Sequence, residues 1–290
     1  MQSAALARQR ATIAVSDIKR NVVHIYDPAG DELAQLTGFR QPAGLASDIK
    51  GDLYVADNGN HRVQIYAAGF RTRPTTLSDP GYDPLGVDSY NDGQIVAVAN
   101  SLATNFGPGN VKFFTNGQLT NTVSSPVIPY FSSCAFDAAG NLYVQGNGID
   151  HHARVGEIIG GAHGHKVTLL TTSNGLGYSS NLSGIQVTTA GQIAVGAYAG
   201  PGSHKTVYTY DPPVGESLGS PVFATALLGT EPGALFAFAK NMTSLYTADF
   251  SGESQQYAYP AGGNALSTID VSGQPYGIAV IPTQYPKVQK

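Results

Sequence analysis

Four of the seven histidines lie in one short run, HHARVGEIIGGAHGH, at positions 151–165. Histidine pairs at this spacing are typical ligands of zinc and similar ions. The residues between the two pairs, Ala153–Ile159, form a predicted β-strand, which at about 3.3 Å per residue separates the pairs by about 20 Å. The two pairs therefore cannot share one ion. We expect His151 and His152 to be solvated loop residues, with a metal bound by these two alone as the alternative.

No set of residues in the sequence stands out as a nucleophilic site. The nucleophile elbow of serine hydrolases requires a sharp strand-to-helix turn, and no helix is predicted anywhere in this sequence. The single cysteine, Cys134, lies in the apolar stretch FSSCAF, so we expect a buried, unreactive thiol and no internal disulfide. The glycine-rich segments at 107–109 and 160–161 precede no predicted helix, which excludes a phosphate-binding loop of the helix N-terminal kind.

The composition limits the classes of partner. The net charge is -4 and charged residues make up 12% of the chain, so nothing favours a nucleic-acid ligand. No apolar run is long enough for a transmembrane helix. Residues 1–10, MQSAALARQR, lack the apolar core of a signal peptide. We expect a flexible leader there and an exported, periplasmic or extracellular monomer whose signal segment is absent from this sequence, with a cytosolic location as the alternative.

The elements that must position any site are short strands in a repeating unit. The clearest copy is Gln41–Tyr66, in which Asp52–Ala56 and Arg62–Tyr66 alternate apolar and polar residues with the period of a half-buried strand. Five further copies follow a drifting period, and no window shows helical spacing with caps. The predicted units span 11–38 with 275–282, 39–79, 80–125, 126–173, 174–228 and 229–273, and a tail covers 283–290.

The C-terminal strand completes this pattern. Pro275–Ile278 matches the start of a first strand at Pro42–Leu45, while the N-terminal unit lacks a strand of that kind. A strand shared between the two ends closes a ring and removes exposed sheet edges. The sequence therefore predicts an all-β, six-bladed β-propeller with four antiparallel strands per blade.

One repeat resembles a known family. The segments Pro42-x-Gly44-Leu45, Gly51-Asp52-Leu53-Tyr54-Val55-Ala56-Asp57 and Asn60-x-Arg62-Val63-Gln64-Ile65-Tyr66 are similar to an NHL repeat. We expect this motif to be structural. Gly51 allows a tight turn with positive φ, and Asp57 accepts hydrogen bonds from the turn that contains Asn60 and pairs with Arg62.

The resemblance implies a six-bladed propeller and leaves the activity open. NHL-like propellers include binding modules, and the wider six-bladed group includes lactonases and strictosidine-synthase-like proteins. The lactonases hold a divalent ion in the channel through a Glu, Asn side chains and an Asp. That likeness makes Glu231 the metal candidate, with Asn100 and Asn147 as companions and Asp88 and Asp249 as weaker ones. We expect no cofactor, with Ca²⁺ or another divalent cation as the alternative.

In a propeller, the loops that lead into first strands share one face with the loops that join second to third strands. We predict this face to be the ligand face, suited to a small molecule, a saccharide or a protein. We expect a binding scaffold, with a metal-assisted hydrolase or lactonase as the alternative, and packing of the aromatic loop residues as the structural interpretation. The candidates are Tyr82, Phe106, Tyr130, His151, His152, Tyr178 and His204, with His61 on the same face.

Overall fold

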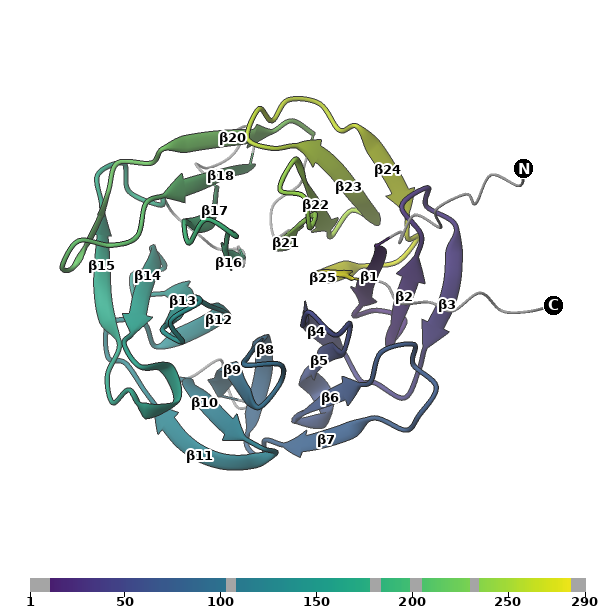
Figure 1. Ribbon diagram of the computed structural model, residues 1–290, viewed down its shortest axis with the longest axis horizontal. Coiled ribbons are helices and arrows are strands. Elements are labelled where there is room, and N and C mark those ends of the chain that lie inside the picture. The colour runs from purple at the N-terminus through teal and green to yellow at the C-terminus, as the bar shows by residue number, and fades with distance from the viewer. Residues whose placement is uncertain (1–10, 103–107, 178–183, 199–204, 230–234, 283–290) are drawn as a thin grey trace, which may run out of the picture.

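A computed structural model describes residues 11–102, 108–177, 184–198, 205–229 and 235–282. Six sheets stand around a central axis, each with its first strand innermost (Figure 1). The predicted all-β, six-bladed propeller is thereby confirmed. Within the described residues the helical segments are the 3₁₀ turns η1 (Asn58–Asn60) and η2 (Gly161–His163). No helix in this part of the chain has the length and apolar character to span a membrane.

The strands follow the repeat closely. Blade 1 contains β25 (Pro275–Ile281), β1 (Thr12–Asp17), β2 (Val22–Tyr26) and β3 (Glu32–Leu36). Blade 2 contains β4 (Pro42–Ser47), β5 (Leu53–Asp57), β6 (Arg62–Tyr66) and β7 (Thr75–Ser78), and blade 3 contains β8 (Tyr82–Tyr90), β9 (Ile95–Leu102), β10 (Asn110–Thr115) and β11 (Gln118–Val123). Blade 4 contains β12 (Tyr130–Phe136), β13 (Leu142–Asn147), β14 (Ala153–Ile158) and β15 (Thr168–Thr172). Blade 5 contains β16 (Ile185–Val187), β17 (Ile193–Tyr198), β18 (Lys205–Tyr210) and β20 (Phe223–Leu227), and blade 6 contains β21 (Leu235–Phe238), β22 (Ser244–Asp249), β23 (Glu253–Ala258) and β24 (Ser267–Asp270).

The ring closes through blade 1. Strand β25 pairs antiparallel with β1, from Thr12 opposite Ile281 to Asp17 opposite Pro275. The C-terminal strand therefore supplies the inner strand that the N-terminal segment lacks, as its sequence predicts.

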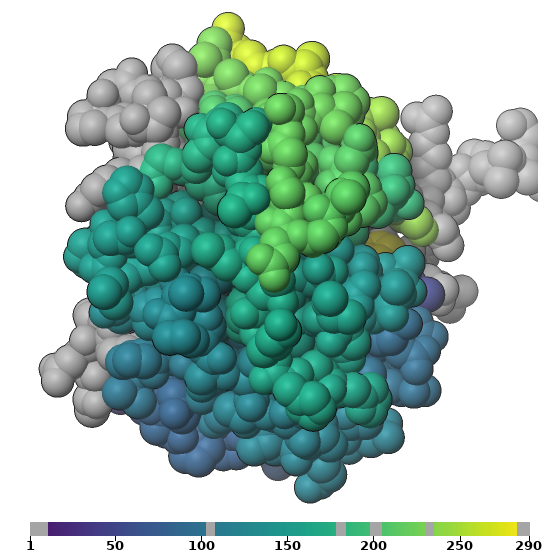
Figure 2. Space-filling view, turned by 90° about the vertical axis from the view of Figure 1, so that its left-hand side faces the viewer, coloured from purple at the N-terminus to yellow at the C-terminus, as the bar shows by residue number. Residues whose placement is uncertain are grey.

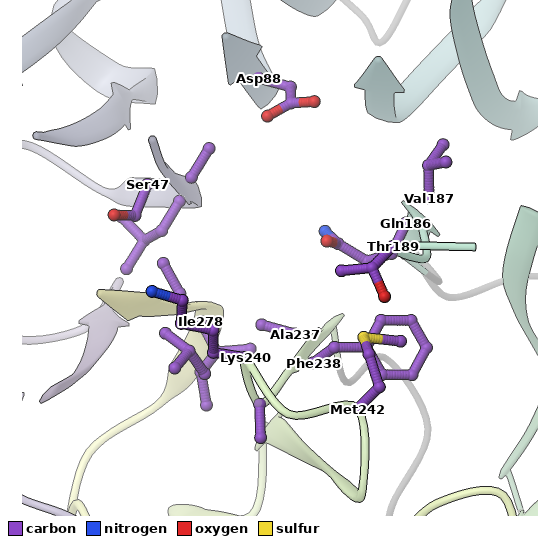
Figure 3. Close-up of a pocket in the computed structure, with 15 residues that line it drawn as sticks. Ser47, Asp88, Gln186, Val187, Thr189, Ala237, Phe238, Lys240, Met242 and Ile278 are labelled. Carbon is purple, nitrogen blue, oxygen red and sulfur yellow. The ribbon is translucent and has the colours of Figure 1, made fainter. Parts of the chain in front are cut away.

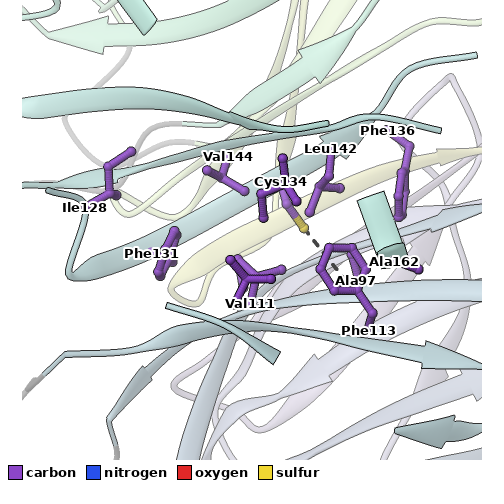
Figure 4. Close-up of a cluster of buried hydrophobic side chains, with 13 residues drawn as sticks. Ala97, Val111, Phe113, Ile128, Phe131, Cys134, Phe136, Leu142, Val144 and Ala162 are labelled. Atoms are coloured by element: carbon purple, nitrogen blue, oxygen red, sulfur yellow. Dashed lines mark hydrogen bonds between the residues drawn. The ribbon is translucent and has the colours of Figure 1, made fainter. Parts of the chain in front are cut away.

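Apolar side chains fill the spaces between neighbouring blades. Between blades 3 and 4, Phe113 and Phe131 are fully buried and pack with Cys134 and Val144 (Figure 4). Each such aromatic ring contributes on the order of 2–3 kcal/mol through burial. Cys134 is 3% exposed, and burial raises the pKa of its thiol well above the usual range. The predicted burial of Cys134 is confirmed.

One strand has no counterpart in the prediction. Residues Ser217–Gly219 form β19, which pairs in parallel with the outer edge of β15 in the neighbouring blade. The Thr171 N–H donates to the Glu216 carbonyl oxygen, and the Ser173 N–H donates to the Gly219 carbonyl oxygen, both at 2.9 Å. Figure 2 shows the green segment of blade 5 lying across the teal surface of blade 4. The added strand covers backbone groups that an open sheet edge leaves unpaired.

Candidate functional site

The six inner strands line the axis, and one level of the channel carries mostly alanine. The strand pairings place Ala46, Asp88, Ala135, Gln186, Ala237 and Ala279 at equivalent positions, each opposite the same position of its second strand. Four blades therefore carry only a methyl group at this position, and three of these alanines, Ala46, Ala237 and Ala279, line a space beside the axis. Blades 3 and 5 instead present a carboxyl and an amide.

A cavity of about 220 Å³ occupies this space. This volume is far above the roughly 10–15 Å³ that a single buried water needs. The inner strands of blades 1, 2, 3, 5 and 6 contribute to its wall, and it extends to the loops that follow β16 and β21. In Figure 3 the Asp88 carboxyl and the Gln186 amide point into the cavity from different sides. The polar residues around it are Ser47, Asp88, Gln186, Thr189 and Lys240.

Asp88 is held in place by the next blade. Its Oδ2 accepts the Phe136 N–H at 2.8 Å, so the carboxyl bridges β8 and β12. Burial raises the pKa of Asp88 from 3.8 to about 6, and the backbone N–H groups of Phe136 and Ser89 oppose this rise. The group is mainly ionised at neutral pH and protonated in mild acid. An acid with a raised pKa inside a cavity is a marker of functional sites.

Lys240 provides the positive charge of the cavity wall. It is exposed and follows β21 in blade 6, across the axis from β8 in blade 3 (Figure 1). Phe238 and Met242 lie beside it and make this side of the cavity more apolar. Among the described residues, Asp88 and Lys240 form no ion pair with each other.

The expected ligand face carries a different polar group, between blades 2 and 3. The Lys112 ammonium pairs with the buried carboxylate of Asp79 and lies 4.4 Å from the centre of the Tyr82 ring. His61 Nδ1 lies 3.0 Å from Asp83 Oδ1. The Asn100 amide, a metal candidate, donates to Asn110 Oδ1 at 3.1 Å. One face of the Tyr82 ring is therefore occupied by the Lys112 ammonium.

The remaining sequence candidates are spread over the molecule. Tyr130 is half-buried and lies opposite Asn147 in the β12–β13 pair, so these two candidates are brought together. His151 and His152 are exposed beside the Asp150–Arg154 ion pair. Phe106, Tyr178, His204 and Glu231 lie outside the described residues. Within the described ranges no group of three or more His, Cys, Asp or Glu residues is arranged to hold a metal. The ligand-face and metal assignments stay predictions.

The NHL-like motif forms a buried network. The Asp57 side chain is fully buried, and its Oδ2 accepts from Arg62 Nε at 2.6 Å and from Gln64 Nε2 at 2.9 Å. Asn60 donates to both carboxylate oxygens, and Gly51 has the expected positive φ of 87°. The backbone donor differs from the expected one. It is the Arg40 N–H before the first strand, at 2.8 Å, because that loop folds over the end of β5.

A second buried charge lies between blades 5 and 6. Lys205 begins β18 and is 1% exposed, and its ammonium finds no hydrogen-bond partner among the described residues. Burial lowers the pKa of Lys205 from 10.5 to about 7, while the nearby Asp249 carboxylate opposes the shift. An unsatisfied buried amine destabilises the fold at the pH values where it is charged.

The cavity residues were within reach of the sequence only indirectly. The family resemblance points to Asp88 only as a weaker companion of a metal, and no motif in the sequence points to Gln186. The signal is positional, because both residues follow the buried residue of a first strand, where Ala46 and Ala135 stand in other blades. Aligning first strands alone reveals the two polar exceptions.

Comparisons with known proteins agree with this architecture. The NHL repeat family matches residues 39–66. No curated protein matches the sequence. A protein of unknown function from Bacteroides caccae superposes with a TM-score of 0.68 at 12% identity, over 94% of this chain and 100% of that one. In a nidogen/laminin complex, a chain superposes with a TM-score of 0.69 at 13% identity, over 95% of this chain and 100% of that one.

A third similar structure is hydrazine synthase from Kuenenia stuttgartiensis, with a TM-score of 0.60 at 15% identity, over 85% of this chain and 73% of that one. At such identities the likeness shows the fold and carries no function. The chain is a six-bladed β-propeller whose second blade carries an NHL repeat.

Proposed function

We propose that this propeller is a binding scaffold that holds a small polar molecule in its channel cavity. The observation that carries the proposal is the pair of polar side chains, Asp88 and Gln186, directed into a cavity that Ala46, Ala237 and Ala279 line at the equivalent positions of three other blades. Polar groups that face a cavity can form hydrogen bonds with a ligand whose donors and acceptors complement them. The described lining contains no histidine and no cysteine, so its chemistry favours recognition by hydrogen bonds and charge.

The scaffold suits such a role physically. Asp88 and Gln186 stand on inner strands that are paired to their neighbours, and Asp88 is also fixed by the Phe136 N–H. Groups held on paired strands lose little conformational entropy when a ligand binds, which preserves affinity.

A cavity-filling variant tests the proposal. Ala237→Leu places a larger side chain in the cavity wall, and Ala139→Leu is the matched control in an exposed turn of blade 4. Wild-type protein is screened against mixtures of small polar metabolites by thermal shift and ligand-observed NMR. We expect hits that the control retains and Ala237→Leu loses. Hits that survive in a folded Ala237→Leu protein, or no hit at all, would refute binding in the cavity.

We further propose that the scaffold is exported and monomeric. The low share of charged residues, 12%, supports this proposal. Fractionation of cells that express the full gene, together with sedimentation of the purified chain, tests both points. Recovery of the protein in the cytosol only, or a stable dimer, would contradict them.

A further inference from the structure

The two charges of the cavity wall lie on opposite sides of the ring. Asp88 belongs to blade 3 and Lys240 follows the inner strand of blade 6, and these blades face each other across the axis (Figure 1). They are the charged residues of the described lining. The cavity therefore has a negative wall and a positive wall, with a gap that the two side chains do not close by pairing.

Two further polar residues of the lining lie on another pair of opposite blades. Ser47 lies on the inner strand of blade 2 and Gln186 on that of blade 5, which also face each other. Figure 3 shows the Gln186 amide on a third side of the cavity, apart from both Asp88 and Lys240. An amide donates and accepts hydrogen bonds, so it suits a ligand that carries groups of both kinds.

The charge pattern selects the class of ligand. A simple amine would be attracted by the Asp88 carboxylate and repelled by the Lys240 ammonium. A simple carboxylate would be attracted by Lys240 and repelled by Asp88. A molecule with an ammonium group and a carboxylate satisfies both walls at once. The volume of about 220 Å³ suits a small molecule, and Phe238, Met242 and Ile278 offer contacts to an aliphatic portion.

We propose that the cavity recognises a small zwitterion of the amino-acid type, whose ammonium group lies against Asp88 and whose carboxylate lies against Lys240. This inference rests on the proposed function and adds the class of ligand.

A matched ligand series tests it. α-Amino acids and short ω-amino acids are compared with the corresponding amines, carboxylates and neutral amides, by calorimetry and ligand-observed NMR at neutral pH. We expect binding by members of the zwitterion set, and at least about tenfold weaker binding by each singly charged or neutral analogue, the loss of one charge-assisted contact.

Two variants test which end of the zwitterion lies against Asp88 and which lies against Lys240. Asp88→Asn is expected to weaken the binding of the zwitterion and to change the binding of the matched carboxylate little. Lys240→Gln is expected to weaken the binding of the zwitterion and to change the binding of the matched amine little. Lys50→Gln, at an exposed lysine of blade 2, is the control. Circular dichroism verifies that each variant is folded.

The possible failures are distinguishable. If amides or amines bind as well as zwitterions and lose binding in Ala237→Leu, the charge inference fails and the proposed function stands. If no zwitterion binds while another metabolite does, the same conclusion holds. If neither the series nor the metabolite mixtures yield a ligand, both proposals fail.

Discussion

Replacing Asp88 by asparagine should stabilise the protein at neutral pH and not in acid. Asparagine keeps the shape of the side chain and an oxygen that accepts the Phe136 N–H, and it removes the charge. The folded state holds the Asp88 proton more tightly than the unfolded chain, because its pKa is about 6 instead of 3.8. The Asp88 carboxyl therefore favours folding fully at pH values below the unfolded-state pKa of 3.8, and this stabilisation is lost as the pH rises through the folded-state pKa of about 6.

The size of the effect follows from that difference. A shift of about 2 units at about 1.36 kcal/mol per unit costs the ionised protein about 3 kcal/mol of stability at neutral pH. The carboxyl faces a cavity wide enough for water, which reduces the cost. We therefore expect Asp88→Asn to raise the free energy of unfolding by about 1–3 kcal/mol at about pH 8, and by less than about 0.5 kcal/mol at about pH 4.

Urea unfolding at both pH values measures this difference directly, with the m-value as a check that the unfolded state has not changed. Asp92→Asn, at an exposed carboxylate of the loop after β8, is the matched control and should show no such pH dependence. A gain of equal size at both pH values, or a loss of stability near neutral pH, would refute the reasoning about a buried charge.

Three further predictions concern other sites. Lys205→Met should stabilise the protein by up to about 5 kcal/mol at about pH 6, because the folded state must hold the charged amine in a buried site and its pKa is therefore lowered. This gain should shrink towards about pH 10, where the unfolded chain also loses the Lys205 proton. Denaturant titrations across this pH range measure the gain, and a variant that is less stable than wild type in acid would contradict the prediction. Asp57→Ala should cost about 3 kcal/mol because it leaves the donors of Arg62 and Gln64 unpaired. Asp31→Ala, at an exposed carboxylate of blade 1, should change stability by less than about 0.5 kcal/mol in the same unfolding assay, and equal effects would show that the network is not structural. A chelator should leave the melting temperature unchanged, and elemental analysis should find no stoichiometric divalent ion; a bound ion would favour the hydrolase alternative and Glu231 as its ligand.

Local patterns explain why the fold was predictable. The alternation in Arg62–Tyr66 and the match between Pro275–Ile278 and Pro42–Leu45 depend on neighbours in sequence, so they identify strands and the closing strand of the ring. Strand β19 has three residues and no pattern of its own. Its pairing with β15 is set by tertiary contact and is invisible in the sequence.

The site was less predictable for a similar reason. Asp88 and Gln186 stand about a hundred residues apart in the sequence, and they line the same cavity only because two blades place equivalent positions beside the axis. The strongest motif in the chain surrounds Asp57, and its role is to hold the second blade together. Polar side chains at single positions of poorly matching repeats carry the information about the cavity.

The pairing that closes the ring also fixes how the chain responds to pulling. Thr12 and Ile281 lie opposite each other at the same end of the β1–β25 pair. Tension applied to the two chain ends therefore opens this ladder one hydrogen bond at a time, as a zipper opens, instead of loading all its bonds together. Blade 1 is consequently the mechanically weak point of the propeller, although the same strands complete its sheet at rest.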